Sequence, residues 1–302
     1  MTKPNDETLW CFRFEEHSAD GLELADEFLS ALELDHSSYF DRETGTLRHT
    51  VYATDEEGRR EALRRFTEAL PAWQAMGLAI SATEEFTLRR SEWAEAWKDF
   101  FKPIELSERL MIRPGWYHDP LRPGQQLVVL DPGLSFGTGQ HPTTFYCLRR
   151  IDRLAAEHPG LAMLDAGCGS GILAIAAAKL GYSVVDAFDF DPDAVEVARE
   201  NAAVNHVEKT VVPIVADAAD HPGREGGYDL VCANLLGHLL IAFAPNINRW
   251  VRPGGHLVLA GILANEFDRV AAAYTALGFR EIDRETIREW TGGTFLAPQF
   301  PR

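Results

Sequence analysis

The second half of the sequence alternates between short apolar runs and amphipathic segments, and this alternation restricts the fold more than any other feature. From residue 141 onward, FYCLRRIDRLAAE predicts a helix, LAMLDAGCGSG a strand that runs into a glycine turn, and ILAIAAAKLG the next helix. SVVDAFDFD predicts a second strand, and PDAVEVARENAAVN a helix with Pro192 in its first turn. The runs VVPIVADAAD, YDLVCANLL and GHLVLAGIL predict further strands, with helical segments between and after them. This order favours a mostly parallel sheet covered on both faces, with a ligand site at the carboxyl ends of its strands.

The first 88 residues show a different order of elements. LWCFRF alternates with a period of two, as a strand does, and GLELADEFLSALEL has apolar residues at helical spacing. YFDRETGTLRHTVYAT predicts a hairpin around Glu43-Thr44-Gly45, EEGRREALRRFTEALPAW a helix up to Pro71, and GLAISATEEF a last strand. The order βαββαβ predicts a small ferredoxin-like α+β domain. Many functions occur on that fold, so the fold alone names none of them.

A tryptophan-rich segment separates the two patterns. In SEWAEAWKDFFKPIEL the aromatic residues recur every three or four positions, which predicts a helix with one apolar stripe that ends at Pro103. RLMIRPGW and QLVVLDPG then predict short strands around a turn rich in proline and glycine. We therefore expect three parts: a ferredoxin-like domain over residues 1–88, a linker helix over 89–106, and a Rossmann-like α/β domain over 107–302. The linker helix is expected to pack between the domains, and it is also a candidate hinge.

Charge and cysteine content exclude several classes of protein. The net charge of −17 opposes nucleic-acid binding through a general positive field and is compatible with a basic protein partner, although solubility alone also explains it. The N-terminus lacks the pattern of a signal peptide, and no run of 18 apolar residues predicts a membrane helix. The four cysteines are widely scattered, so we expect neither disulfides nor a metal site, and we expect a cytoplasmic location.

Two glycine-containing loops are candidates for a ligand site. LSFGTGQHPTT, residues 134–144, lacks the lysine that a P-loop needs. DAGCGSG has glycines at 167, 169 and 171 between a strand and a helix, where a backbone without side chains lets a ligand approach closely. Ile172 stands where a dinucleotide fingerprint has its third glycine, which disfavours an NAD-dependent dehydrogenase. A turn that serves only packing is the structural alternative.

Polar residues occur where the predicted strands end. Asp189 lies 18 residues after the last of those glycines, where a carboxylate can accept both hydrogen bonds of a ribose diol; a solvated acid is the alternative. Asp191 is expected to cap the following helix. Asp217 follows the third strand, either beside a bound ligand or as an ordinary loop acid. Asn234 ends the fourth strand, where it either terminates the strand or accepts a hydrogen bond from an attacking amine.

These motifs together resemble the ribosomal protein L11 methyltransferase (PrmA) family. The resemblance rests on LDPGLSFGTGQHPTT, DAGCGSGILAIAAAKLG, DFDPDAVEVARENAAVN, ANLLGHLL and RPGGHLVLAGIL, which follow that family's order and spacing. WAEAWKDFFKPIEL and IRPGW are similar to its linker region, and the predicted N-terminal domain to its substrate-recognition domain. The resemblance implies an enzyme that uses S-adenosylmethionine (SAM) to methylate lysine side chains and the N-terminal α-amine of a ribosomal protein. It implies a basic protein partner and no membrane.

The resemblance also implies a set of site residues. Cofactor contacts fall on Thr144, Gly167, Asp189 and Asn234. Gly169 and Gly171 complete the glycine turn, Phe136, Gly137 and Thr138 belong to the preceding loop, and Asp217 lies in the region that faces adenine in related enzymes.

Methyl transfer to an amine is an in-line displacement that depends mainly on positioning. The attacking amine must be neutral, and burial lowers the pKa of a lysine from its usual value of about 10.4. We therefore expect Asn234 to orient the amine, as the catalytic residue, and assign no general base. His141 and His238 have the right side chain for a base, but His141 is expected to hold its loop in place. The alternatives are a methyltransferase that acts on another protein lysine and a non-catalytic SAM-binding protein.

Overall fold

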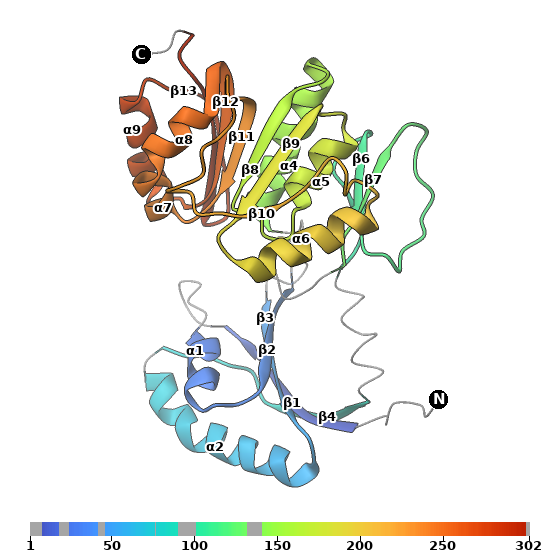
Figure 1. The fold of residues 1–302 in the computed structure, drawn as a ribbon. Coiled ribbons are helices and arrows are strands. Elements are labelled where there is room, and N and C mark those ends of the chain that lie inside the picture. Colours follow the sequence, from blue (N-terminus) through green and yellow to red (C-terminus); the bar gives the residue numbers. More distant parts are fainter. Residues whose placement is uncertain are drawn as a thin grey trace. The chain divides into compact units, whose positions relative to one another are not determined.

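The computed structural model describes residues 8–17, 24–41, 46–75, 77–89, 101–131 and 141–299. The chain divides into two compact units, residues 1–100 and 101–302. A small antiparallel sheet forms the first unit, and a large, mostly parallel sheet lies in the second (Figure 1). The predicted fold class is therefore confirmed.

The first unit packs two helices on one face of its sheet. Its elements are β1 (Thr8–Glu16), α1 (Leu24–Ala31), β2 (His36–Asp41), β3 (Thr46–Ala53), α2 (Glu56–Ala75) and β4 (Glu84–Arg89). Four described strands pair antiparallel in the order β2-β3-β1-β4, the arrangement expected from βαββαβ. The period of two in β1 places Phe12 and Phe14 on one face, where both rings contact Phe66 of α2.

The helix α2 does not end at Pro71, as predicted, but continues to Ala75. Pro71 has no N–H, so it cannot donate the helical hydrogen bond to the Thr67 carbonyl. Both residues lie on the exposed side of the helix, where water can donate to that carbonyl instead. On the other side Trp73 is buried and stacks on Phe28 with ring centroids 5.0 Å apart. This packing holds the last turn in place against the proline.

The second unit is a sheet between two layers of helices. Seven described strands pair in the order β10-β9-β8-β11-β12-β14-β13. In chain order the elements are α4 (Pro142–Glu157), β8 (Ala162–Ala166), α5 (Ile172–Lys179), β9 (Val184–Asp189), α6 (Pro192–Val204), β10 (Ile214–Val215), β11 (Tyr228–Asn234), α7 (Gly237–Ala242), α8 (Ala244–Trp250), β12 (Val251–Leu263), α9 (Phe267–Ala276), β13 (Arg280–Ile287) and β14 (Trp290–Leu296). The strands from β10 to β12 are parallel, and β14 is antiparallel to both of its neighbours. The order reverses between β8 and β11, which makes this the switch point where such sheets bind ligands.

Each face of this sheet has its own apolar core. α4, α5 and α6 cover one face, whereas α7, α8 and α9 cover the other (Figure 1). The central strands contribute to both cores: Met163 and Leu230 belong to the first, and Leu164 and Val231 to the second. Burial on both faces explains why these strands are continuous apolar runs in the sequence. None of the described helices is long and apolar enough to cross a membrane.

A separate small sheet precedes α4. RLMIRPGW and QLVVLDPG form the predicted strands β6 (Leu110–Arg113) and β7 (Gln126–Val129), and β5 (Ile104–Glu105) pairs with β6. The side chain of Asn205 accepts the Val129 N–H and donates to the Val129 carbonyl, both at 2.7 Å, which ties β7 to the end of α6. The predicted linker helix over 89–106 falls mostly on residues 90–100, which lie outside the described residues. Its last part is wrong, because residues 101–106 are not helical and Ile104–Glu105 form β5.

Two strands are shorter than the sequence predicts. β4 begins at Glu84 rather than at residue 77, and before it Ile80 makes only an isolated bridge to Glu16. β10 comprises Ile214 and Val215 alone. Pro213 has no N–H to donate to a neighbouring strand, so the long apolar run around it cannot pair throughout.

The sequence pattern does not predict the antiparallel pair of β13 and β14. β14 contains Gly292 and Gly293, and glycine is depleted in strands. Both glycines make room for aromatic rings, because a Cβ on either would lie 2.4 Å from a ring carbon of Tyr146 or Phe267, respectively. Side chains from the two helix layers pack against these two positions and leave room only for glycine. The two glycines are the reason that the sequence does not show a strand pattern here.

Candidate active site

The glycine turn between β8 and α5 has the strained backbone that its sequence predicts. Gly167, Gly169 and Gly171 have φ angles of 76°, 51° and 77°, in the region that side chains disfavour. The N–H groups of Gly167 and Cys168 both donate to the Phe188 carbonyl at 2.9 Å, which fixes the turn against β9. A Cβ on Gly167 would lie 2.5 Å from Cδ2 of Leu235, so this glycine also permits the close approach of the loop after β11.

Asp189 joins the end of β9 to the glycine turn. Its Oδ2 accepts the Gly169 N–H at 2.8 Å and its Oδ1 accepts the Asp191 N–H at 3.1 Å. The side chain is buried, and a carboxylate has about four acceptor positions, so two bonds leave it capacity for a ligand. Asp191 accepts the Asp193 N–H and caps α6, as predicted.

Asp165, in β8, is a buried acid to which the sequence reading assigns no role. Its Oδ2 accepts the Ala174 N–H at 3.1 Å, whereas its Oδ1 is buried without a hydrogen-bond partner in the described residues. Burial raises its pKa to about 7, the Ala174 bond opposes the rise, and the charge of Asp189 adds to it. An acidic residue inside an otherwise apolar strand was the signal that could identify it.

Asn234 is the last residue of β11, and the loop that follows it begins at Leu235. Its Oδ1 is buried and has no hydrogen-bond partner among the described residues. Gly261 of β12 has a φ of 80°, and a Cβ there would lie 3.0 Å from that Oδ1 and 2.7 Å from the Leu235 carbonyl. The neighbouring strand is therefore shaped to leave room for the end of β11.

The first turn of α4 presents a third buried oxygen. Thr144 is 1% exposed, and its Oγ1 has no partner in the described structure. His141 is the N-cap of α4: its Nδ1 accepts the Thr143 N–H and lies 2.7 Å from the Thr143 hydroxyl. This contact makes His141 the cap of α4, whereas the loop that it is predicted to hold, residues 132–140, lies outside the described residues. His238 lies exposed on α7.

The N-terminus of α4 lies at the same edge of the sheet as Asn234. The His141 ring contacts the Trp290 ring at a centroid distance of 5.1 Å. Trp290 pairs with Leu263 at the carboxyl end of β12, the strand next to β11. Thr144, the glycine turn, Asp189 and Asn234 therefore belong to one edge, the carboxyl edge at the switch point.

Two further residues lie after β9 and β10. Asp217 is exposed, and its Oδ1 accepts the Ala219 N–H at 2.7 Å, so in this structure it shapes a turn. Ala216, just before it, donates to the Asp189 carbonyl at 2.9 Å, which keeps Asp217 near the candidate site. Phe190 follows Asp189 and is 77% exposed, an aromatic face that the sequence analysis does not single out.

Part of the predicted site cannot be placed. Phe136, Gly137 and Thr138 lie in residues 132–140, outside the described residues. Among the residues that are described, no group of three or more histidine, cysteine, aspartate or glutamate side chains is arranged to hold a metal ion.

The arrangement suits a ligand rich in N–H and O–H groups. Three oxygens lack partners in the described structure, one each on Thr144, Asp165 and Asn234. All three can accept a hydrogen bond, and the Thr144 hydroxyl can also donate one. A buried polar atom left unpaired costs about 1–3 kcal/mol, which a ligand that donates to it removes. The glycine turn supplies the space for that ligand to approach the backbone.

Comparison with protein families gives a match over almost the whole chain. The model described as "Ribosomal protein L11 methyltransferase (PrmA)" matches residues 2–295. The match thus includes both units and every predicted site residue.

Individual relatives agree with this match. The chain is 38% identical over 235 residues to a ribosomal protein L11 methyltransferase of Chloroflexus aurantiacus, covering 70% of this chain and 71% of the relative. It is 40% identical over 241 residues to one of Pelobacter propionicus, covering 78% and 76%. Its fold is similar to the crystal structure of a ribosomal protein L11 methylase from Lactobacillus delbrueckii subsp. bulgaricus, with a TM-score of 0.59 and 31% identity over 66% of this chain and 100% of that one.

Proposed function

The chain belongs to the ribosomal protein L11 methyltransferase family, and from this premise we propose that it methylates amino groups of ribosomal protein L11. It is a SAM-dependent methyltransferase, and the groups that we expect it to modify are lysine side chains and the N-terminal α-amine. The family match over residues 2–295 is the observation on which the proposal rests. The cytoplasm, where ribosomal proteins are made, is its proposed location.

The residues at the carboxyl edge fit the cofactor. SAM has amino and hydroxyl groups that can donate to the oxygens of Thr144, Asp165 and Asn234 that have no partner in the described structure. Asp189 is the proposed acceptor for the ribose, and the exposed ring of Phe190 offers an apolar face to the adenine. The proposed cofactor-binding set is Thr144, Gly167, Gly169, Gly171, Asp189 and Asn234, with Phe136, Gly137, Thr138 and Asp217 around it.

When bound, SAM supplies a methyl group on a positively charged sulfur, and the remaining work falls to the chain's own residues. The amide oxygen of Asn234 accepts a hydrogen bond from the substrate amine and so directs its lone pair toward the methyl group. An amide is not a base, so Asn234 orients the amine without taking its proton. Burial of the amine favours its neutral form, and the proton passes to water.

The first unit is proposed to recognise the protein substrate. Its four-stranded antiparallel sheet has the ferredoxin-like order, and it contains none of the proposed cofactor residues. The chain's net charge of −17 complements a basic ribosomal protein. The segment that joins the two units, where the linker helix is predicted, is proposed as a hinge between them.

The test is methyl transfer to the purified substrate. Incubation with isotopically labelled SAM and ribosomal protein L11, followed by mass spectrometry of its peptides, is expected to show methylated lysines and a methylated N-terminus. Methylation of another protein in a ribosomal extract, with none on L11, would assign a different substrate. An absence of SAM binding would remove the proposal altogether.

A further inference from the structure

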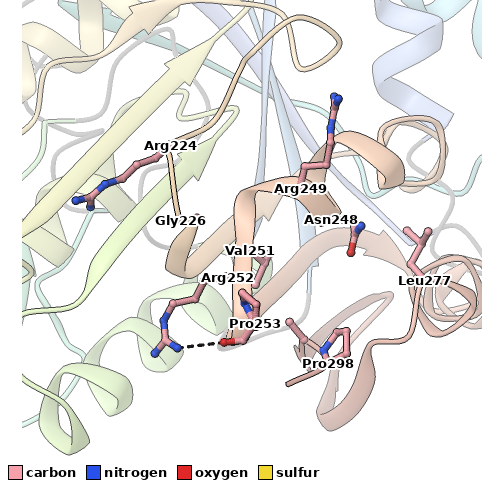
Figure 2. Close-up of a pocket in the computed structure, with 11 residues that line it drawn as sticks. Arg224, Gly226, Asn248, Arg249, Val251, Arg252, Pro253, Leu277 and Pro298 are labelled. Atoms are coloured by element: carbon pink, nitrogen blue, oxygen red, sulfur yellow. Dashed lines mark hydrogen bonds between the residues drawn. The ribbon is translucent and has the colours of Figure 1, made fainter. Parts of the chain in front are cut away.

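The two edges of the large sheet differ in what they can bind. A cleft of about 500 Å³ opens at the amino edge, where Gly227 precedes β11 and Val251 begins β12. Figure 2 shows that the guanidinium groups of its arginines point away from the cleft in different directions: Arg224, Arg249 and Arg252. The helices α8 and α9 also end beside it, and the carbonyls at a helix C-terminus repel an anion. The described lining therefore does not gather charge on one ligand.

The carboxyl edge, in contrast, has an exposed strip beside Asn234. Leu236 is 54% exposed two residues after Asn234, and Leu263, the last residue of β12, is 38% exposed. Exposed leucines are ordinary when they are scattered singly, but these two belong to chain segments that meet. A Cβ on Gly237 would lie 3.3 Å from Oε2 of Glu266, and the Glu266 N–H donates to the Leu263 carbonyl at 2.9 Å. We call Leu236, Leu263 and Glu266 the edge strip.

The pairing of β11 with β12 brings the edge strip to the proposed reacting centre. Asn234 is in register with Ala260 of β12, and the Leu235 N–H donates to the Ala260 carbonyl at 3.1 Å. Gly261 comes next in β12, and a Cβ there would lie 3.0 Å from Oδ1 of Asn234. The end of β12 therefore runs beside the end of β11, and the edge strip begins next to the oxygen that is proposed to hold the amine.

Glu266 gives the edge strip a carboxylate that the described residues do not neutralise. Its side chain is half-buried, and it makes neither a hydrogen bond nor an ion pair within the described part of the chain. The nearby Asp268, in contrast, is paired with Arg284. Gly237, next to the Glu266 carboxylate, is the first residue of α7, and the N-terminus of a helix stabilises a negative charge. The carboxylate is thus held at this edge and can attract a cation from outside.

An apolar surface next to a carboxylate matches the chemistry of a lysine side chain. Lysine has a long methylene stem, which buries on apolar surface, and an ammonium group at its tip. The N-terminal α-amine of a protein is attached directly to the backbone and has no such stem. Leu236 and Leu263 therefore favour a lysine over an α-amine, whereas Glu266 attracts both because both arrive as cations.

We propose that the edge strip is the docking surface for the target lysine of the protein substrate. The methylenes lie on Leu236 and Leu263, and Glu266 draws the ammonium group to the edge before burial beside Asn234 removes its charge. This inference rests on the proposed function, and it adds the physical basis on which the same site prefers lysine side chains.

Leu236→Ser tests the apolar part of the edge strip on a substrate that carries both kinds of amine. Labelled SAM, purified ribosomal protein L11 and mass spectrometry give the rates at its lysines and at its α-amine separately. We expect kcat/KM at the lysines to fall by roughly tenfold, mainly through a higher KM, because about two methylenes lose apolar contact. At the α-amine we expect a loss of less than about twofold. Ile282→Ser, at a 40% exposed isoleucine of β13, is the control and is expected to keep both rates.

Glu266→Gln tests the charged part of the edge strip. We expect kcat/KM at both kinds of amine to fall by about threefold to fivefold at low salt, as for one partly exposed ion pair. At about 300 mM salt the loss is expected to shrink to less than about twofold, because salt screens the attraction. Glu208→Gln makes the same change of charge at an exposed position before β10 and is expected to change neither rate. Calorimetry with S-adenosylhomocysteine is expected to give the wild-type affinity in every variant.

The outcomes distinguish the edge strip from the proposed function. If the wild-type protein does not methylate ribosomal protein L11, the proposed function fails and the edge strip with it. If it methylates the α-amine alone, or if Leu236→Ser loses equally at lysines and α-amine, only the edge strip is overturned. The same holds if either control variant loses as much as its partner. If the wild type methylates lysines alone, a loss in Leu236→Ser that is absent from Ile282→Ser supports the edge strip.

Discussion

At the scale of single residues, the candidate site concentrates polar atoms that the described structure does not satisfy. Thr144, Asp165 and Asn234 each bury one oxygen without a partner in the described part of the chain. Buried polar groups are normally paired, so three exceptions near one edge of the sheet indicate a site completed by a ligand. Each residue contributes in a different way, and substitution separates these contributions.

Asn234→Ala tests the proposed orientation of the amine. We expect the rate of methyl transfer to fall by roughly a hundredfold, the scale seen when one positioned polar group is removed from a reacting centre. Cofactor affinity is expected to fall by no more than about tenfold, because the other cofactor residues remain. Steady-state kinetics and calorimetry measure the two effects. Asn265→Ala, an exposed asparagine just after β12, is the control, and a normal rate in Asn234→Ala would exclude the orienting role.

Asp165→Asn tests the effect of the buried acid on stability. Burial raises the pKa of Asp165 to about 7, so the unfolded chain loses this proton at lower pH than the folded chain does. The folded state without cofactor is therefore destabilised through this group as pH rises from about 4 to about 7. Asparagine cannot ionise and still accepts the Ala174 N–H, so from pH 5 to pH 8 its stability relative to wild type should rise by about 2–3 kcal/mol. Guanidinium unfolding at both pH values measures this, and a constant difference would contradict it.

At the scale of elements, the turn between β8 and α5 does the most to build the site. Its three glycines with positive φ connect the end of β8 to Asp189 of β9 and to the loop after β11. The turn therefore sets the relative positions of residues that are far apart in the sequence.

Gly167→Ala separates backbone strain from crowding in this turn. The new Cβ would sit at a φ of 76° and 2.5 Å from the Leu235 side chain, which must move. Gly181→Ala is the matched control, because its φ is 90° and a Cβ there meets no atom within 4 Å. Both variants are expected to lose about 1–3 kcal/mol of stability from strain. Only Gly167→Ala is expected to lose SAM affinity, by roughly tenfold or more, and equal affinity in the two variants would count against a cofactor role for the turn.

The sequence predicts well those elements whose pattern of buried residues can be seen within the segment itself. The strands and helices from β8 to α6 read clearly because each strand is apolar on both faces and Asp191 caps the last helix. Pro71 misleads because the packing of Trp73, which no local pattern contains, extends α2 past it. The sequence does not predict β14, because Gly292 is unusual in a strand. This glycine leaves room for the Tyr146 ring, which belongs to α4.

At the scale of the whole molecule, the sequence predicts the edge at which the site lies but not every residue in it. Strand–helix alternation places Asp189 and Asn234 at strand ends, and the family resemblance adds Thr144. The sequence marks Asp165 as an acid in an apolar strand, but the unpaired oxygen that makes it a site residue is a property of the packed structure.

The charge of the whole chain predicts how the substrate is found. A net charge of −17 attracts a basic ribosomal protein over distances that salt screens, with a Debye length of about 10 Å at 0.1 M salt. We therefore expect kcat/KM for ribosomal protein L11 to fall by roughly tenfold as salt rises from about 50 mM to about 300 mM, mainly through slower association. SAM affinity, measured by calorimetry in the same buffers, should change by less than about twofold, because it depends on short-range contacts in a buried site. A kcat/KM that does not respond to salt would mean that the acidic surface maintains solubility and does not guide the substrate to the enzyme.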